Sequence, residues 1–177
     1  MNLRKSSFPP VVGDNCRVLI LGSLPGEKSL AQQQYYAHPR NLFWHLIGQV
    51  IDVELVGLPY PARLNTLREN GVGLWDVVAS AQREGSLDAQ LRNPTANPIA
   101  ALCQTLPHLR AVAFNGATAF KLGSALVPAE VPTVKLLSSS PANAGYSADQ
   151  KSKQWTILRE FLHPILSPQG EGPIAES

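Results

Sequence analysis

Four short apolar runs, separated by longer segments, constrain the fold of this chain most strongly. They are RVLIL at 17–21, GVGLWDVV at 71–78, AVAF at 111–114 and the stretch at 133–137. Short runs rich in Val, Ile and Leu and bounded by turn residues are typical of buried strands. Because helical patterns lie between them, the sequence predicts an α/β fold: a three-layer α/β/α domain around a central four-stranded parallel sheet.

The expected helices cover residues 41–50, 61–70, 98–106, 117–126 and 147–163. Asn41 is a suitable cap for the first of them, and Ser147 with Gln150 can form a capping box at the start of the last. Two segments are expected to be loops: the connection at 22–40 and the polar stretch that follows the second strand as far as Asn93. Long loops in compact domains often carry function.

The size and charge of the chain suit one packed domain. It has 177 residues, of which 44% are apolar and 16% charged. We expect the domain to span residues 1–166 and residues 167–177 to form a flexible tail. The formal charge is only +2, from 15 Lys and Arg against 13 Asp and Glu, so any contact with nucleic acid must be local.

Cysteine content and hydropathy bear on the compartment. Cys16 and Cys103 are too few for a disulfide framework or an all-cysteine iron–sulfur cluster. The sequence also contains no apolar run long enough to cross a membrane, which takes about 18 residues or more. We therefore expect a cytoplasmic protein that makes no membrane contact.

Several kinds of catalytic and binding motif are missing. The turn at 22–26 lacks the glycine spacing of a dinucleotide fingerprint and the Lys-Ser/Thr of a phosphate loop. There is no GxSxG or SxxK motif, and the four histidines show no zinc-type spacing with the cysteines. The sequence therefore predicts that the protein binds no cofactor and no metal.

Polar and aromatic residues gather at the expected carboxyl ends of the strands, where open α/β sheets bind ligands. These residues are Tyr35, Tyr36, His38, Asn41, Asn115, Ser138, Ser139, Ser140 and Asn143. Tyrosine offers a stacking face, asparagine pairs with a base edge, and serine hydroxyls and loop amides hold phosphates. We expect the strand ends to converge on one crevice that takes a nucleobase.

A set of motifs resembles the uracil-DNA glycosylase superfamily over residues 15–163. The motifs are GSLPGEKSLAQQQYYAHPRNLFW at 22–44, GLWDV at 73–77, RxGSLD at 83–88, FNG at 114–116 and SSSPANA at 138–144. The resemblance is strongest to the branch of hypoxanthine (deoxyinosine) DNA glycosylases, also called family 6. Its most specific part is the first motif, in which a glycine-proline turn, an aromatic residue, HPxN and FW follow in the family's order.

The resemblance implies a role for particular residues. It places Tyr36 where the family stacks an aromatic ring on the extruded base, and Gly22 and Ser23 in the turn that borders that base. It places Asn41 at the catalytic asparagine of the hypoxanthine branch and Asn115 where several branches read the base edge. The DNA-gripping loop of the family corresponds to Ser138, Ser139, Ser140, Pro141, Ala142 and Asn143.

One departure separates this chain from the mismatch-specific uracil glycosylases. Their catalytic asparagine lies inside the first glycine turn, at the position that is Leu24 here. The loop at 138–144 also lacks the histidine of the uracil-excising enzymes. Both departures favour hypoxanthine over uracil as the excised base.

The resemblance therefore implies a monofunctional DNA glycosylase that acts as a monomer on double-stranded DNA containing a deaminated base. Two alternatives are a mismatch-type uracil-DNA glycosylase and a non-catalytic nucleic-acid binding module. Simpler interpretations also exist for single residues: Asn41 as a helix cap, Asn115 as a turn residue and His38 as a support for its loop. We expect Asp76 to fix a loop by accepting backbone hydrogen bonds rather than to activate water.

Overall fold

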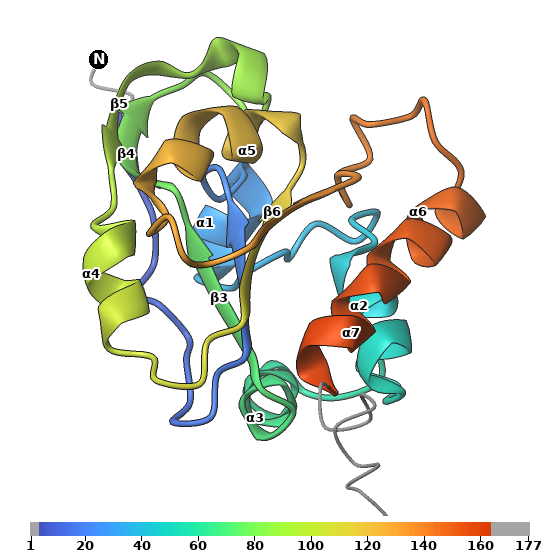
Figure 1. The fold of residues 1–177 in the computed structure, drawn as a ribbon. Coiled ribbons are helices and arrows are strands. Elements are labelled where there is room, and N and C mark those ends of the chain that lie inside the picture. The colour runs from blue at the N-terminus through green and yellow to red at the C-terminus, as the bar shows by residue number, and fades with distance from the viewer. Residues whose placement is uncertain (1–3, 164–177) are drawn as a thin grey trace, which may run out of the picture.

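A four-stranded parallel sheet forms the centre of the molecule (Figure 1). The structure is a computed structural model and describes residues 4–163. The strands of the sheet, in the spatial order β3-β2-β6-β7, are β3 (Val72–Asp76), β2 (Val18–Gly22), β6 (Ala111–Asn115) and β7 (Thr133–Leu136). Every neighbouring pair is parallel, so the predicted sheet is confirmed.

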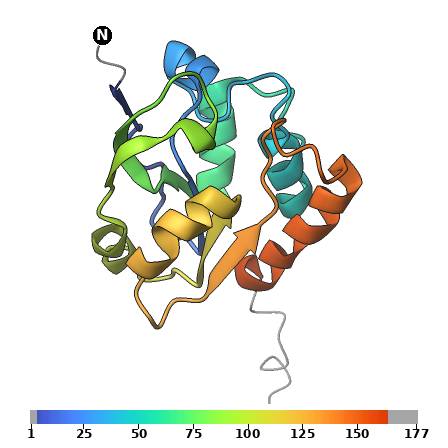
Figure 2. The ribbon, with the colours of Figure 1, turned by 90° about the horizontal axis from the view of Figure 1, so that it is seen from above.

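Helices cover both faces of this sheet (Figure 2). One face carries α2 (Phe43–Ile51), α3 (Tyr60–Glu69), α6 (Ala148–Trp155) and α7 (Arg159–Leu162), and the other carries α4 (Ile99–Gln104) and α5 (Ala117–Gly123). Strand β2 supplies both cores, because Val18 and Ile20 pack into the first and Leu19 and Leu21 into the second. A strand that is buried on both faces has a continuous apolar sequence, which is why β2 could be predicted.

A second, antiparallel sheet was not predicted. It has the order β1-β4-β5 and consists of β1 (Arg4–Ser6), β4 (Val78–Gln82) and β5 (Arg92–Ala96). The expectation of a loop as far as Asn93 is therefore wrong. All of β5 is exposed and β4 pairs with a strand from the start of the chain, so this segment shows no apolar alternation.

The connection at 22–40 also contains more structure than expected. Helix α1 (Glu27–Gln32) lies within it and buries only Ser29, so it lacks an apolar period that could reveal it. The last expected helix is divided into α6, a 3₁₀ turn at Thr156–Leu158 and α7. Its predicted capping box is confirmed: the Gln150 N–H donates to Ser147 Oγ over 3.1 Å, and the Ser147 N–H donates to Gln150 Oε1 over 2.8 Å.

The strand order shows where the chain reverses the direction in which it adds strands, which is the topological switch point of the sheet. From β2 the chain moves outward to β3 on one side, and it then crosses to β6 on the other side of β2. Ligand crevices of open α/β sheets open at such a point, here between the carboxyl ends of β2 and β6. The tail expected at 167–177 lies outside the described residues, and within 4–163 no helix is long and apolar enough to cross a membrane.

Candidate active site

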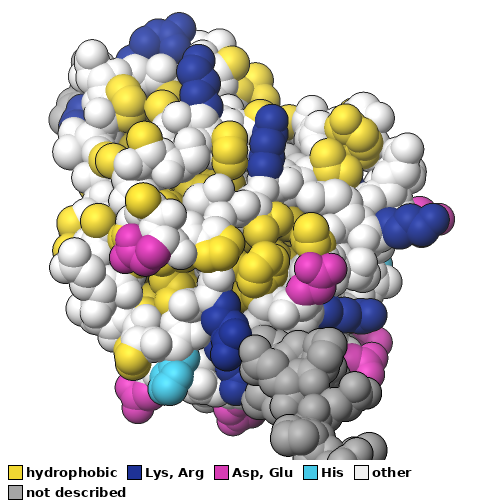
Figure 3. Space-filling model, viewed as in Figure 1, with side chains coloured by type: hydrophobic (Ala, Val, Ile, Leu, Met, Phe, Trp, Pro, Cys, Tyr) yellow, Lys and Arg dark blue, Asp and Glu magenta, His cyan; other side chains and the backbone are white. Residues whose placement is uncertain are grey.

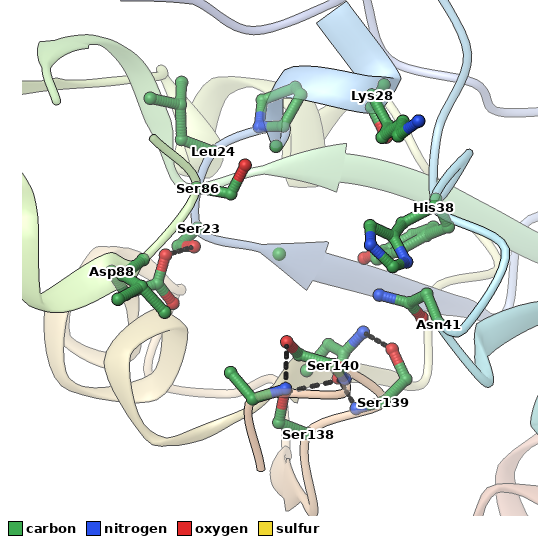
Figure 4. A pocket seen from close by; sticks show the side chains of 18 of the residues that line it. Ser23, Leu24, Lys28, His38, Asn41, Ser86, Asp88, Ser138, Ser139 and Ser140 are labelled. Carbon is green, nitrogen blue, oxygen red and sulfur yellow. Dashed lines mark hydrogen bonds between the residues drawn. The ribbon is translucent and has the colours of Figure 1, made fainter. Parts of the chain in front are cut away.

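A pocket of about 870 Å³ opens at this switch point (Figure 4). Its volume falls within the range of small-molecule sites, roughly 300–1,000 Å³. All of the site residues expected from the sequence line it: Gly22, Ser23, Tyr36, Asn41, Asn115, Ser138, Ser139, Ser140, Pro141, Ala142 and Asn143. The predicted convergence of the strand ends on one crevice is therefore confirmed.

Asn41 is held in a turn that directs its amide group into the pocket. Its backbone N–H donates to the His38 carbonyl over 3.0 Å, and its Oδ1 accepts from the Phe43 N–H at the start of α2 over 3.0 Å. The N-cap of α2 is Leu42, so the prediction that Asn41 is the cap is wrong by one residue, although Asn41 still pairs the first N–H of the helix. Because Oδ1 is bound to an N–H donor, the orientation of the amide is fixed and its Nδ2 points toward the centre of the pocket (Figure 4).

His38 supports the same turn. Its Nδ1 accepts from the Arg40 N–H over 3.1 Å, and the side chain lines the pocket beside Asn41. The structural role expected for this histidine is confirmed.

The two adjacent tyrosines lie in different surroundings. Tyr35 touches the pocket, but it is only 4% exposed and its hydroxyl donates to the Pro9 carbonyl, so it belongs mainly to the core. Tyr36 lines the pocket and stacks on Phe43, with a centroid distance of 3.9 Å and an angle of 12° between the rings. Its φ of 55° lies in the left-handed region, which costs a bulky residue about 1–3 kcal/mol and is typical of functional sites.

Asn115 connects the end of β6 to the loop at 138–143. Its Nδ2 donates to Ser139 Oγ and its Oδ1 accepts from the Ser139 N–H, both over 2.9 Å. The backbone N–H can only donate, so it fixes which end of the amide is oxygen. The sequence could not show this orientation.

The loop at 138–143 is ordered by its own serines and by α6. Ser138 Oγ accepts from the Ser140 N–H over 3.2 Å, and Ser140 Oγ accepts from the Ala142 N–H over the same distance. The ammonium of Lys151, a buried residue of α6, donates to the Ser140 carbonyl over 3.3 Å. The loop is therefore shaped before any ligand arrives.

The opposite wall of the pocket depends on Arg83, to which the sequence assigned no role. This side chain is 1% exposed and donates to the carbonyls of Leu24, Pro25 and Gly85. Its only signal in the sequence was its place in the RxGSLD motif. Two more contacts hold the wall to the first turn: Ser23 Oγ donates to Asp88 Oδ1 over 2.6 Å, and Ser86 Oγ accepts from the Glu27 N–H over 2.8 Å.

Asp76 lies at the floor of the pocket with an unpaired oxygen. The residue is 3% exposed, and its Oδ2 has no hydrogen-bond partner among the described residues. The expectation that this carboxylate accepts backbone hydrogen bonds is wrong for Oδ2. Burial, assisted by the negative charge of Asp88 and opposed by Arg83, raises the pKa of Asp76 to about 7.

Gly22 leaves the space that the floor needs. A Cβ at this position would lie 2.7 Å from Asp76 Oδ1 and 2.9 Å from the Tyr36 hydroxyl. The Tyr36 hydroxyl is itself buried without a hydrogen-bond partner in the described part of the chain. Burial and the charge of Asp76 raise the pKa of Tyr36, so its phenol is neutral.

Basic side chains on the face shown in Figure 3 are scattered rather than gathered into one patch. Lys28 lies at the pocket, where Figure 4 shows it on the side opposite Ser138. Within residues 4–163, no three His, Cys, Asp or Glu side chains are grouped so that they could hold a metal ion.

Comparisons with known proteins agree with the fold and identify similar proteins. The hypoxanthine DNA glycosylase of Methanosarcina barkeri is 40% identical over 150 residues, which cover 85% of this chain and 95% of the relative. The hypoxanthine DNA glycosylase of Methanosarcina acetivorans is 39% identical over 155 residues, covering 88% and 98%. A solution NMR structure from Methanosarcina acetivorans, named as a candidate uracil DNA glycosylase, superposes with a TM-score of 0.81 at 38% identity, covering 90% and 99%.

The family comparison covers almost all of the described chain. The sequence pattern of the uracil DNA glycosylase superfamily matches residues 9–162, which include every strand of the parallel sheet and every wall of the pocket. The chain belongs to the uracil-DNA glycosylase superfamily.

Proposed function

We propose that this protein is a DNA glycosylase that takes hypoxanthine out of double-stranded DNA and hydrolyses its N-glycosidic bond, leaving an abasic site. The proposal rests on one observation: Tyr36, Asn41 and Asn115 line the same pocket. The similarity to two hypoxanthine DNA glycosylases over most of their length supports the choice of base. We further propose that the protein acts as a monomer.

The chemistry requires stabilisation of charge at both ends of the breaking bond. As the bond from C1′ to the base breaks, the sugar becomes cationic and the base gains negative charge, so donors aimed at the base lower the barrier. The end of Asn41 that faces the pocket is a donor, because its Oδ1 is bound to Phe43. This N–H donates either to the oxygen of the attacking water or to the nucleobase. Asn41 does not itself accept a proton from water.

We assign recognition of the base edge to Asn115. Hypoxanthine presents an O6 acceptor beside an N1–H donor, whereas adenine presents the reverse pair. The amide of Asn115 still has one N–H and one lone pair beyond its two bonds to Ser139, and these match O6 and N1–H. The fixed orientation of the amide would favour hypoxanthine over adenine.

We assign base stacking to Tyr36 and contact with the DNA backbone to the loop at 138–143. Phe43 holds the Tyr36 ring from one side, which leaves the other side for a base. The loop presents serine hydroxyls and backbone amides at the rim of the pocket, where phosphates of the flanking strand would pass. A deaminated base pairs poorly, which lowers the few kcal/mol needed to extrude it.

The test is a comparison of lesions in otherwise identical duplexes. Labelled duplexes that carry deoxyinosine, deoxyuridine or deoxyxanthosine are incubated with the protein and treated with alkali to cut abasic sites. We expect the fastest cutting at deoxyinosine. Faster cutting at deoxyuridine would identify a mismatch-type uracil glycosylase, and binding without cutting at any lesion would identify a non-catalytic module.

A further inference from the structure

We propose that Asp76 is the general acid of this pocket and that its carboxyl group donates a proton to the departing base. This inference rests on the proposed glycosylase function and adds an acid to it. Neither Asn41 nor Asn115 can supply a proton, because a carboxamide does not titrate in the relevant range.

The position of Asp76 directs it to the base rather than to the sugar. It is the last residue of β3 and lies at the floor of the pocket, where it is 3% exposed. The sugar of an extruded nucleotide stays attached to the DNA backbone at the mouth, so only the base reaches the floor. A proton on Asp76 therefore meets ring nitrogens or the exocyclic oxygen of the base.

The unpaired oxygens at the floor indicate a partner that comes with the ligand. Asp76 Oδ2 and the Tyr36 hydroxyl are both buried without hydrogen-bond partners among residues 4–163. Both residues also crowd the same point above Gly22, since a Cβ there would lie 2.7 Å from Asp76 Oδ1 and 2.9 Å from the Tyr36 hydroxyl. Folded proteins pair most of their buried polar atoms, so two adjacent unpaired oxygens in a ligand pocket are unusual.

The groups that face Asp76 favour its protonated form. Asp88 is negative and Tyr35 and Tyr36 are neutral phenols. Among residues 4–163, the cation that lowers the pKa of Asp76 is Arg83. The Arg83 guanidinium already donates to three carbonyls, of Leu24, Pro25 and Gly85. Burial dominates, and a pKa of about 7 keeps a large share of Asp76 protonated at neutral pH, as an acid catalyst requires.

The proposed step balances as follows. The bond between C1′ and the base breaks, and its electron pair goes to the base. The Asp76 carboxyl proton moves to the base, which leaves as a neutral molecule, and Asp76 becomes a carboxylate. Water adds to C1′, and the proton that it loses restores the carboxyl group of Asp76 or passes to solvent.

The test is the pH dependence of single-turnover excision from a deoxyinosine duplex, measured from about pH 5.5 to about pH 9. We expect the wild-type rate to fall about tenfold per pH unit above pH ~7. Asp76→Asn, which keeps the shape but carries no acidic proton, should be slower by roughly 10²-fold or more at low pH and independent of pH. Glu54→Gln also replaces a carboxyl group by a carboxamide, but at an exposed site outside the pocket, and should match the wild type.

Two results would overturn the assignment while leaving the glycosylase function intact: a wild-type rate that is flat or rises with pH, or an Asp76→Asn variant as fast as the wild type. A wild type that excises no base would end both proposals. Carbon-13 NMR of labelled aspartate gives a readout that needs no substrate. The resonance absent from Asp76→Asn should titrate near pH 7 in the wild type, and titration near pH 4 would contradict the inference.

Discussion

At the scale of single residues, Asn41 joins local structure to chemistry because its two amide atoms have different tasks. Oδ1 accepts from the Phe43 N–H at the start of α2, and Nδ2 faces the pocket. We predict that Asn41→Ala slows excision by roughly 10²–10³-fold, equivalent to about 2.7–4 kcal/mol. Loss of the hydrogen bond to the Phe43 N–H should also lower the free energy of unfolding by about 0.5–1.5 kcal/mol.

Asn41→Asp separates the two tasks. The carboxylate still accepts from Phe43 but has no N–H to direct into the pocket. We expect a stability close to that of the wild type, measured by urea denaturation, together with a rate as low as that of Asn41→Ala. An Asn41→Asp variant with full activity would show that the donor is not needed.

The buried carboxyl group of Asp76 gives a prediction about stability alone. Its pKa is raised to about 7 in the folded protein, whereas an unfolded chain has an ordinary aspartate pKa of about 3.9. Between these values the folded state holds a proton that the unfolded state has released, so the free energy of unfolding falls as pH rises through this window. Asp76→Asn should therefore match the wild type near pH 4 and exceed it at pH 8, by at most ~4 kcal/mol.

Urea denaturation of both proteins at the two pH values measures this difference. Glu54→Gln serves as the control, because its exposed carboxylate keeps solvent around it in both states. An equal gap between wild type and Asp76→Asn at pH 4 and pH 8 would mean that Asp76 titrates normally.

At the scale of elements, Asn115 determines how the loop at 138–143 is attached to the sheet. Removal of its side chain in Asn115→Ala leaves the Ser139 N–H and hydroxyl without their partner, which costs about 1–3 kcal/mol for a buried group. We expect faster hydrogen exchange at the Ser139 amide and weaker binding of duplex DNA with or without a lesion. Asn65→Ala, on the exposed surface of α3, is the matched control and should leave both unchanged.

The elements that the sequence predicted correctly are those whose pattern is local. Strand β2 is buried at every residue, and the capping box at Ser147 lies within four residues of chain. The antiparallel sheet escaped prediction because β1 pairs with β4 far along the chain, as Lys5 with Ala81, and β5 is wholly exposed. Pairing between distant polar strands leaves no periodic signal.

The same distinction applies to the site. The order of the motifs was sufficient to predict that Tyr36, Asn41 and Asn115 line one pocket. The burial of Arg83 and the unpaired oxygen of Asp76 could not be predicted, because both depend on how the segments at 22–26 and 83–88 pack against each other. Arg and Asp are exposed in most folded proteins, so their residue type predicts the opposite of the burial found for Arg83 and Asp76.

At the scale of the whole molecule, the low net charge limits how DNA can be held. With a formal charge of only +2, binding should involve few phosphates and weaken only moderately with salt. Lys28 at the pocket is the cation that we expect to contact the flanking strand. Lys28→Ala should lower duplex affinity for any sequence and reduce the slope of log K against log salt by ~0.9.

Arg110→Ala is the control for this measurement. Arg110 is exposed and precedes β6 at the amino edge of the sheet, opposite the pocket. Fluorescence anisotropy over a series of salt concentrations should give the wild-type slope for Arg110→Ala. An unchanged slope for Lys28→Ala would mean that DNA approaches from another side.

A substitution at Gly22, with a control substitution at Gly57, tests whether a base enters as far as the pocket floor. Gly22→Ala would place a methyl group 2.7 Å from Asp76 Oδ1 and 2.9 Å from the Tyr36 hydroxyl, whereas a Cβ at Gly57 has nothing within 4 Å. Free hypoxanthine released from a deoxyinosine duplex is measured by mass spectrometry, with the fold of each variant checked by circular dichroism. We predict release by wild type and Gly57→Ala and almost none by a folded Gly22→Ala. Equal release by Gly22→Ala, or no free base from the wild type, would contradict the binding of an extruded base at this floor.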